Sequence, residues 1–251
     1  PSFSFKEDSE TGQLLIGGMG ELHLDIMADR IKREFGVQTR IGSPQVAYRE
    51  GIEKTIVHSE ELDRQAGSLS QQAQVCFEIS PTKEASFIFE SNLSDKELSS
   101  FIISSIRKGA KESLNAGPTS GYPVLGVRAK LVSASFKTEK ADEVAFQIVT
   151  NMCIRSALLK LGTVLLEPVM LLEISSPNDY MSNVITDLGT RRAIVQNIDH
   201  KQSTQVLSAY VPLAEIFGYS TKLRSISQGR ATYVMKFHDY NIVPERIRRN
   251  I

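Results

Sequence analysis

Apolar and polar residues alternate with two different periods in the last third of the chain, which predicts a small α+β domain. The pattern predicts a strand, a helix, two strands, a helix and a strand, at 169–174, 178–191, 193–198, 205–211, 212 onward and 231–237. Pro212 suits a first helical position, because its missing N–H needs no partner there. Leu213, Ile216 and Phe217 then form an apolar stripe, with Gly218 inside the same predicted helix, and the last strand is expected to bury one face. This element order is that of a split βαβ, ferredoxin-like domain.

The start of the chain has a similar but incomplete pattern. It predicts strands at 2–6 and 13–16, a helix at 21–35 and a strand at 37–41. Leu22, Ile26, Met27 and Ile31 form the predicted buried stripe of that helix, and Gly36 is expected to end it. A ferredoxin-like unit that begins here lacks its first strand and first helix.

The middle of the chain predicts a further α+β region with two amphipathic helices. Strands are predicted at 46–57, 75–79, 87–89 and 124–133, and loops at 60–70 and 134–141. One helix follows a capping box from Ser94 to Glu97 and turns inward Leu98, Phe101, Ile102, Ile106 and Ala110. The other, at 143–161, has on one face Phe146, Val149, Cys153, Ala157 and Leu161.

Composition is that of an ordinary globular protein and does not reveal a partner. The 251 residues include 29 Lys and Arg against 29 Asp and Glu, so net charge does not indicate nucleic acid, although 246–249 is locally basic. Cys76 and Cys153 lack the spacing of a zinc site or a disulfide framework, which suits a reducing compartment. No apolar run approaches about 18–20 residues, so we expect no membrane span. The start at Pro1, without a signal peptide, predicts a piece of a longer protein.

The sequence predicts no catalytic constellation. Gly17, Gly18 and Gly20 before a helix are typical of a phosphate-binding loop, but the third glycine of GxGxxG is replaced by His23 and no GxxxxGK[ST] is present. A tight turn is the favoured interpretation, and an enzyme that holds a nucleotide there is the alternative. The four histidines stand apart from any nucleophile or second ligand, so neither catalytic residues nor a metal is expected.

Four arginines near glycine and serine backbone form the candidate binding set: Arg191, Arg192, Arg224 and Arg230. Guanidinium forks and loop N–H groups suit phosphate oxygens, so contact with RNA is one interpretation. Surface arginines in weak local ion pairs, on a scaffold protein with no RNA role, are the other.

Three stretches of the chain carry a resemblance to a known family. They are LLIGGMGELHLDIMADRIKREFGV with GSPQVAYRE, then AGPTSGYPVLGVRAKL, and finally EPVMLLEISSPNDYMSNVITDLGTRRAIV with VPLAEIFGYSTKLRSISQGRATYVMKF. In this order they resemble the third, fourth and C-terminal domains of the elongation factor G family. The resemblance implies a domain III-like part at 1–44, a domain IV-like part at 45–165 and a domain V-like part at 166–251. The implied fold class is α+β, with two ferredoxin-like split βαβ domains, the first truncated, flanking a domain like domain 2 of ribosomal protein S5.

The resemblance implies the ribosome-binding C-terminal part of a translational GTPase that promotes GTP-dependent translocation of tRNA and mRNA. The implied partners are the ribosomal RNA of both subunits, A-site tRNA and mRNA, and an N-terminal GTPase domain that holds GTP and Mg²⁺ outside this chain. The chain itself is expected to have no catalytic residue, cofactor or membrane contact. Its four arginines would face the GTPase-associated region of ribosomal RNA. The implied location is the cytoplasm, with the mitochondrial matrix as the alternative.

The tip of the fourth domain departs from the family pattern. The family's Gly-Ser-Tyr-His-Asp loop corresponds to 134–138, so Lys137 replaces the histidine, and its glycine-rich second loop corresponds to 67–74. The resemblance implies RNA contact by Ser68, Ser135 and Lys137. A lysine still neutralises phosphate, but the loss of glycines weakens close backbone approach. These changes suit ribosome recycling, in which a paralogue splits the two ribosomal subunits together with recycling factor, and this is the alternative function. Drift in a loop that tolerates change is an equal interpretation of the same differences.

Overall fold

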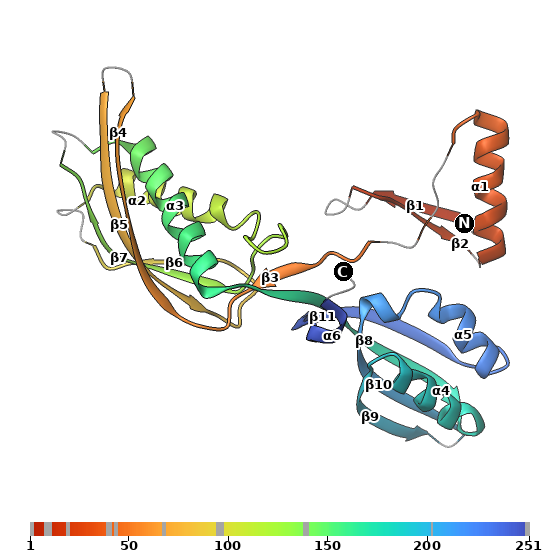
Figure 1. The fold of residues 1–251 in the computed structure, drawn as a ribbon. Coiled ribbons are helices and arrows are strands. Elements are labelled where there is room, and N and C mark those ends of the chain that lie inside the picture. The colour runs from red at the N-terminus through yellow and green to blue at the C-terminus, as the bar shows by residue number, and fades with distance from the viewer. Residues whose placement is uncertain are drawn as a thin grey trace. The chain divides into compact units, whose positions relative to one another are not determined.

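The computed structural model of the protein describes residues 3–7, 12–18, 21–38, 42, 45–66, 69–93, 98–137, 141–201 and 203–248. Backbone contacts divide the chain into two compact units, Pro1–Ala47 with Glu167–Asn241 and Tyr48–Leu166 with Ile242–Ile251. Figure 1 shows the helices and strands of both units.

The C-terminal part of the first unit is built on four strands in the order β11-β8-β10-β9. They are β8 (Val164–Pro177), β9 (Ile194–Lys201), β10 (Thr204–Pro212) and β11 (Thr232–Ile242). Helices α4 (Asn178–Thr190) and α5 (Tyr219–Ile226) cover one face (Figure 1). Strand β10 is antiparallel to both of its neighbours. The element order and the strand order confirm the predicted ferredoxin-like split βαβ fold.

Side-chain alternation turns one face of these strands toward the helices. Leu172 and Ile174 of β8 pair directly with Ala209 and Leu207 of β10, and all four are fully buried. The helices bury against them Met181, Val184, Leu188, Tyr219 and Leu223. Burial of each large apolar side chain contributes about 1.5–3 kcal/mol. This packing fixes the C-terminal end of α4, where the first two candidate arginines lie.

The helix predicted to start at Pro212 is wrong in its first half. Pro212 is the last residue of β10, and a 3₁₀ turn, Leu213–Glu215, follows it. Gly218 adopts φ 71° just before α5, and this left-handed conformation interrupts a right-handed helix. Of the predicted stripe, only Ile216 is fully buried, and α5 instead buries Tyr219.

Strand β11 is present where it was predicted, but its expected buried face is not. Val234 and Phe237 are each more than half exposed, and only Tyr233 and Tyr240 are partly covered. The strand lies at the end of the strand order, and α5 is only 8 residues long. The helix layer is therefore too short to cover an 11-residue strand along its length.

The N-terminal part of the first unit consists of a hairpin and one helix. Strands β1 (Phe3–Glu7) and β2 (Leu14–Gly18) pair in antiparallel fashion, and α1 spans Glu21–Phe35 as predicted. Gly36 adopts φ 66° and donates its N–H to Lys32 O, the predicted helix end. The predicted stripe is wrong at Ile26, which is 52% exposed. Residues 37–38 form no strand, and 39–41 lie outside the described residues.

The second unit contains a sheet in the order β4-β5-β7-β6 with two helices packed on one face (Figure 1). Its elements are β3 (Arg49–Gly51), β4 (Ile56–Ala66), β5 (Leu69–Pro81), β6 (Ile88–Ser91), α2 (Ser100–Ser113), β7 (Val127–Ser135), α3 (Glu143–Leu161) and α6 (Glu245–Arg248). Strand β5 buries Val75, Phe77 and Ile79 under the helices, as its alternation predicts. Helix α3 has the predicted bounds and fully buries Phe146, Val149, Cys153 and Ala157, whereas Leu161 is partly covered.

Several predictions for the second unit are wrong. The strand predicted at 46–57 is divided into β3 and β4, and the loop predicted at 60–70 belongs to the β4–β5 hairpin. Helix α2 begins after Ser99 rather than at the predicted capping box, whose residues 94–97 lie outside the described part. Phe101 is 64% exposed instead of buried.

The sequence pattern did not indicate how the strand predicted at 87–89 pairs. In the structure, strand β6 pairs in parallel with β7.

Helix α3 also corrects the expectation about apolar runs. Its 19 residues are long and apolar enough to cross a membrane by length and composition, and it is the one such helix among the described residues. In the structure eight of the helix residues are buried, and seven of these belong to the hydrophobic core of the second unit. We therefore interpret α3 as a core helix.

Candidate nucleic-acid interface

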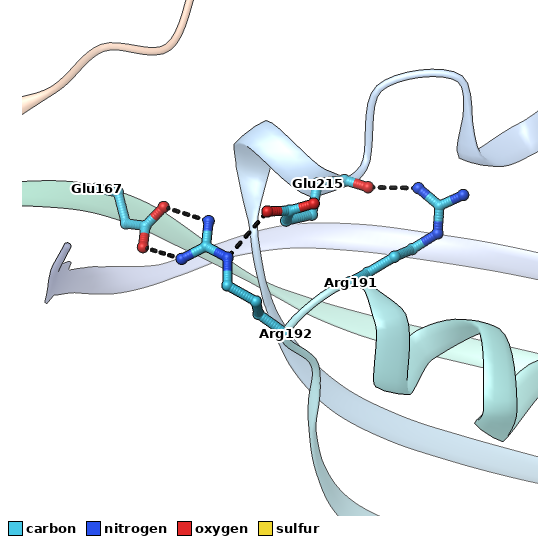
Figure 2. Close-up of polar contacts among 4 residues, drawn as sticks. All are labelled: Glu167, Arg191, Arg192 and Glu215. Atoms are coloured by element: carbon cyan, nitrogen blue, oxygen red, sulfur yellow. Dashed lines mark hydrogen bonds and ion pairs between the residues drawn. The ribbon is translucent and has the colours of Figure 1, made fainter. Parts of the chain in front are cut away.

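Arg192 holds two carboxylates together just after the end of α4 (Figure 2). Its Nη1 and Nη2 atoms donate to the two carboxylate oxygens of Glu167 at 2.6 and 2.9 Å, and its Nε donates to Glu215 at 2.9 Å. Glu167 comes from β8 and Glu215 from the 3₁₀ turn, and the Glu167 side chain is only 3% exposed. The hydrogen bonds to Glu167 raise the pKa of Arg192, so the guanidinium stays charged.

Arg191 is held in a similar way by its own domain. Its Nε donates to Asp187 at 2.8 Å, one helical turn earlier, and its Nη1 donates to the Glu215 carbonyl oxygen at 2.6 Å. The guanidinium carbon lies 4.9 Å from the ring centroid of the fully buried Tyr219. The hydroxyl of Tyr219 has no hydrogen-bond partner among the described residues, and burial raises its pKa. Both guanidinium groups already have partners within the domain. Their contact with RNA stays a prediction.

Arg224 and Arg230 differ, since both are exposed and the described residues place no carboxylate in ion-pair contact with either. Arg224 lies in the last turn of α5, and its carbonyl oxygen accepts the N–H of Gly229 at 2.8 Å. Gln228 and Gly229 both adopt left-handed conformations, with φ 52° and 77°. This tight turn places the two arginines on either side of it.

Tyr180 adds an aromatic ring to this surface that the sequence pattern did not indicate. Its hydroxyl donates to Gln228 Oε1 at 2.9 Å, and the Arg230 guanidinium carbon lies 5.9 Å from its ring centroid. Tyr180 comes from the first turn of α4, 48 residues before Gln228, so no local pattern links them. The Tyr180 ring beside Arg230, whose guanidinium has no acidic partner in the described part of the chain, suits stacking and phosphate contact with RNA. We call Tyr180, Arg224, Gln228 and Arg230 the α5-end surface.

The second unit brings two of the three predicted tip residues to one end of its sheet. Ser135, the last residue of β7, is paired with Gln74 of β5 and donates to Gln74 Oε1 at 3.3 Å. Lys137 donates from Nζ to Glu61 Oε1 of β4 at 2.9 Å. Ser68 lies outside the described residues. The structure thus brings Ser135 and Lys137 next to the β4–β5 hairpin.

A polar chain that sequence reasoning missed ties this hairpin to helix α3. Arg64 of β4 donates to Gln71 Oε1 at 2.8 Å, and Gln71 donates to Asp142 Oδ2 at 2.6 Å. Asp142 also caps α3, accepting the N–H of Val144 at 2.9 Å. The residues come from three separate elements, so their meeting depends on the fold. The end of the hairpin near residues 64 and 71 is therefore braced.

Comparisons with known proteins identify the family. Three models match the chain in succession, described as Elongation Factor G, domain III at residues 1–43, Elongation factor G, domain IV at 44–161 and Elongation factor G C-terminus at 164–251. The chain belongs to the elongation factor G family.

Elongation factor G of Thermotoga maritima is 44% identical over 254 aligned residues, covering all of this chain and 37% of that protein. Elongation factor G of Thermotoga neapolitana is 43% identical, with 36% of its length covered. A crystal structure of a protein from Thermus thermophilus matches with a TM-score of 0.88 at 29% identity, over 99% of this chain and 37% of that one. The chain thus spans little more than a third of the length of these relatives.

The two groups of candidate residues fall in regions of the chain that match different family models. Ser135 and Lys137 lie in the region matched by domain IV, and all four arginines lie in the C-terminal region. Among the described residues no cluster of His, Cys, Asp and Glu is arranged to hold a metal ion. Burial raises the pKa of the Cys153 thiol to about 12, so it is a poor nucleophile at neutral pH.

Proposed function

We propose that this chain is the ribosome-binding C-terminal part of an elongation factor G-type translational GTPase that promotes GTP-dependent translocation of tRNA and mRNA. GTP and Mg²⁺ belong to an N-terminal GTPase domain of the longer protein. The domains proposed are 1–44, 45–165 and 166–251. The family membership supports the class of function. The observation that carries RNA contact is the α5-end surface, where the exposed Arg224 and Arg230 have no acidic partner among the described residues and the Tyr180 ring lies beside Arg230.

The α5-end surface and the sheet end near Lys137 have separate roles in this proposal. Arg224 and Arg230 neutralise ribosomal RNA phosphates, and Tyr180 offers a ring face to an unpaired base. Arg191 and Arg192, at the C-terminal end of α4, are further candidate RNA contacts, although each also holds a carboxylate of its own domain. The sheet end near Lys137 occupies the A site of the small ribosomal subunit and displaces tRNA and mRNA when the GTPase domain reorients it. The protein acts in the cytoplasm, or in the mitochondrial matrix if it is an organellar factor.

Charge reversal at the α5-end surface tests the proposal. The variant Arg224→Glu plus Arg230→Glu is compared with wild type by filter binding to ribosomes over a series of salt concentrations. We expect weaker binding and a slope of log affinity against log salt that is lower by about 1.4–1.8, because two phosphate contacts are lost.

The matched control is Lys54→Glu plus Lys83→Glu, two exposed lysines of the second unit with the same total charge change. This control is expected to bind nearly as wild type does. Binding by the arginine variant that equals the control, at every salt concentration, would reject the assignment of this surface.

Ribosome recycling is a second candidate function, favoured by the residues that differ from the family pattern at the tip of the fourth domain. Lys137 stands where the family has a histidine and is paired with Glu61, and residues 67–74 retain few of the family's glycines. In this alternative a paralogue splits post-termination ribosomes together with recycling factor. Assays of the full-length protein decide between the two functions. A translocase supports tripeptide synthesis, whereas a recycling paralogue supports only the splitting of ribosomes.

A further inference from the structure

Lys137, the cation of the tip, is already compensated by acidic groups of the neighbouring strand. Its Nζ atom lies 2.9 Å from Glu61 Oε1. Glu61 raises the pKa of Lys137, with a smaller contribution in the same direction from the charge of Asp63. Two carboxylates of β4 therefore act on one ammonium group.

Strand register explains why these groups meet. Glu61 of β4 is paired with Gln74 of β5, and Gln74 is paired with Ser135 of β7, so the three residues form one row across the sheet. Lys137 follows two residues after Ser135 and reaches back along this row to Glu61. Asp63 lies two residues beyond Glu61 and thus on the same face of β4.

The pair is easily exchanged, because both partners are open to water. The side chains of Lys137 and Glu61 are 71% and 48% exposed. Exposed ion pairs of this kind are weak and are weakened further by salt. A phosphate oxygen offers Lys137 the same charge and the same hydrogen bond that Glu61 offers.

We propose that Glu61 is an internal competitor for the RNA phosphate that Lys137 contacts, and that it thereby sets how tightly the tip engages RNA. The inference rests on the proposed function. Lys137 exchanges Glu61 for phosphate on docking and returns to Glu61 on release. Glu61 is accordingly an affinity-determining residue that acts through Lys137.

The test measures ribosome binding of Glu61→Gln, Lys137→Gln and the double variant, with Glu53→Gln as a control that removes one exposed carboxylate away from the tip. Glu61→Gln is expected to bind about two- to five-fold more tightly than Glu53→Gln, since a weak competitor is lost. Its salt slope is expected to be steeper by about 0.7–0.9, because one phosphate contact is no longer compensated. Both gains are expected to vanish in the double variant.

Equal binding by Glu61→Gln and Glu53→Gln would overturn the inference. So would a gain that persists in the double variant, since Glu61 would then simply repel RNA without acting through Lys137. Thermal melting of each variant shows whether a loss of binding comes from a loss of fold. Failure of the proposed function looks different, because wild type and the Arg224→Glu plus Arg230→Glu variant would then bind ribosomes equally.

Discussion

Arg192 is the residue on which the turn after α4 depends most. It gives the 3% exposed Glu167 both of its ion-pair hydrogen bonds while adopting φ 56°, which is unfavourable for a residue with a side chain. Arg192→Gln leaves a buried carboxylate without its counter-charge. We expect a loss of about 2–4 kcal/mol in the free energy of unfolding, measured by urea denaturation.

The control for this prediction is Arg128→Gln. Arg128 pairs with Glu90 at 3.6 Å, with both side chains more than 40% exposed. Its loss is expected to cost less than about 1 kcal/mol. Similar losses for the two variants would show that burial of Glu167 does not matter.

Cys153 gives the protein a pH dependence at alkaline pH. Its thiol donates to the His58 carbonyl oxygen at 3.4 Å, and burial raises its pKa from 9.0 to about 12. A raised pKa means that the unfolded state loses this proton first, so the stability is fully present below about pH 9 and is lost as pH rises toward 12.

Urea denaturation of wild type between pH 7 and 11 is expected to show the free energy of unfolding falling above pH 9, by up to about 1.4 kcal/mol per pH unit for this group. Cys153→Ala is expected to flatten the decline. Part of the decline should remain, because burial also raises the pKa of Tyr219. An equal decline in both proteins would contradict the role of the thiol.

The residues of the candidate site were partly predictable, but their partners were not. Arg191 and Arg192 stand out in the sequence because they follow a helix, yet Arg192 meets Glu167 and Glu215 from positions 25 and 23 residues away. Only the fold brings such groups together. The position of Tyr180 beside Gln228 could not be predicted for the same reason.

At the scale of elements, two helical glycines test opposite effects of a methyl group. A Cβ on Gly109 of α2 would lie 2.5 Å from the backbone oxygen of Gln147 in α3, whereas a Cβ on Gly189 of α4 would meet nothing within 4 Å. Gly109→Ala must push two helices apart and is expected to cost about 1–3 kcal/mol.

Gly189→Ala is expected to gain up to about 1 kcal/mol, because alanine is the better helix former. Urea denaturation of both variants against wild type gives the comparison. Two changes of the same sign would mean that helix propensity, rather than the close approach of α2 and α3, decides the outcome.

Helices with clear end signals could be predicted from the sequence, and weak strand patterns could not. The bounds of α1 follow from its apolar spacing and from Gly36 at its end, whereas α3 is a long and mostly apolar helix between Asp142 and Gly162. The second half of strand β4 was missed. Among residues 61–65 only Leu62 is buried, and the strand forms through its pairing with β5. The break at Gly218 was missed because a single glycine does not show from sequence whether a helix continues through it.

At the scale of the whole molecule, the two proposed contact surfaces differ in character. Within the described residues the arginines of the α5-end surface have no acidic partner, whereas Lys137 at the sheet end of the second unit is paired with Glu61. The α5-end surface is expected to supply most of the salt-dependent affinity. At the sheet end, Lys137 is expected to bind either Glu61 or an RNA phosphate. We expect no reactive group to take part in either contact.

Directed hydroxyl-radical cleavage tests this division most directly. An iron chelate is attached to Gln65→Cys near the hairpin end, to Ser225→Cys beside Arg224, or to Glu53→Cys as the control, each in a Cys76→Ala background, and each protein is bound to ribosomes. We expect cleavage of the small ribosomal RNA around the A site from position 65 and of the large ribosomal RNA from position 225, both above the control. Cleavage no stronger than that from position 53 at both sites would contradict the two contact surfaces.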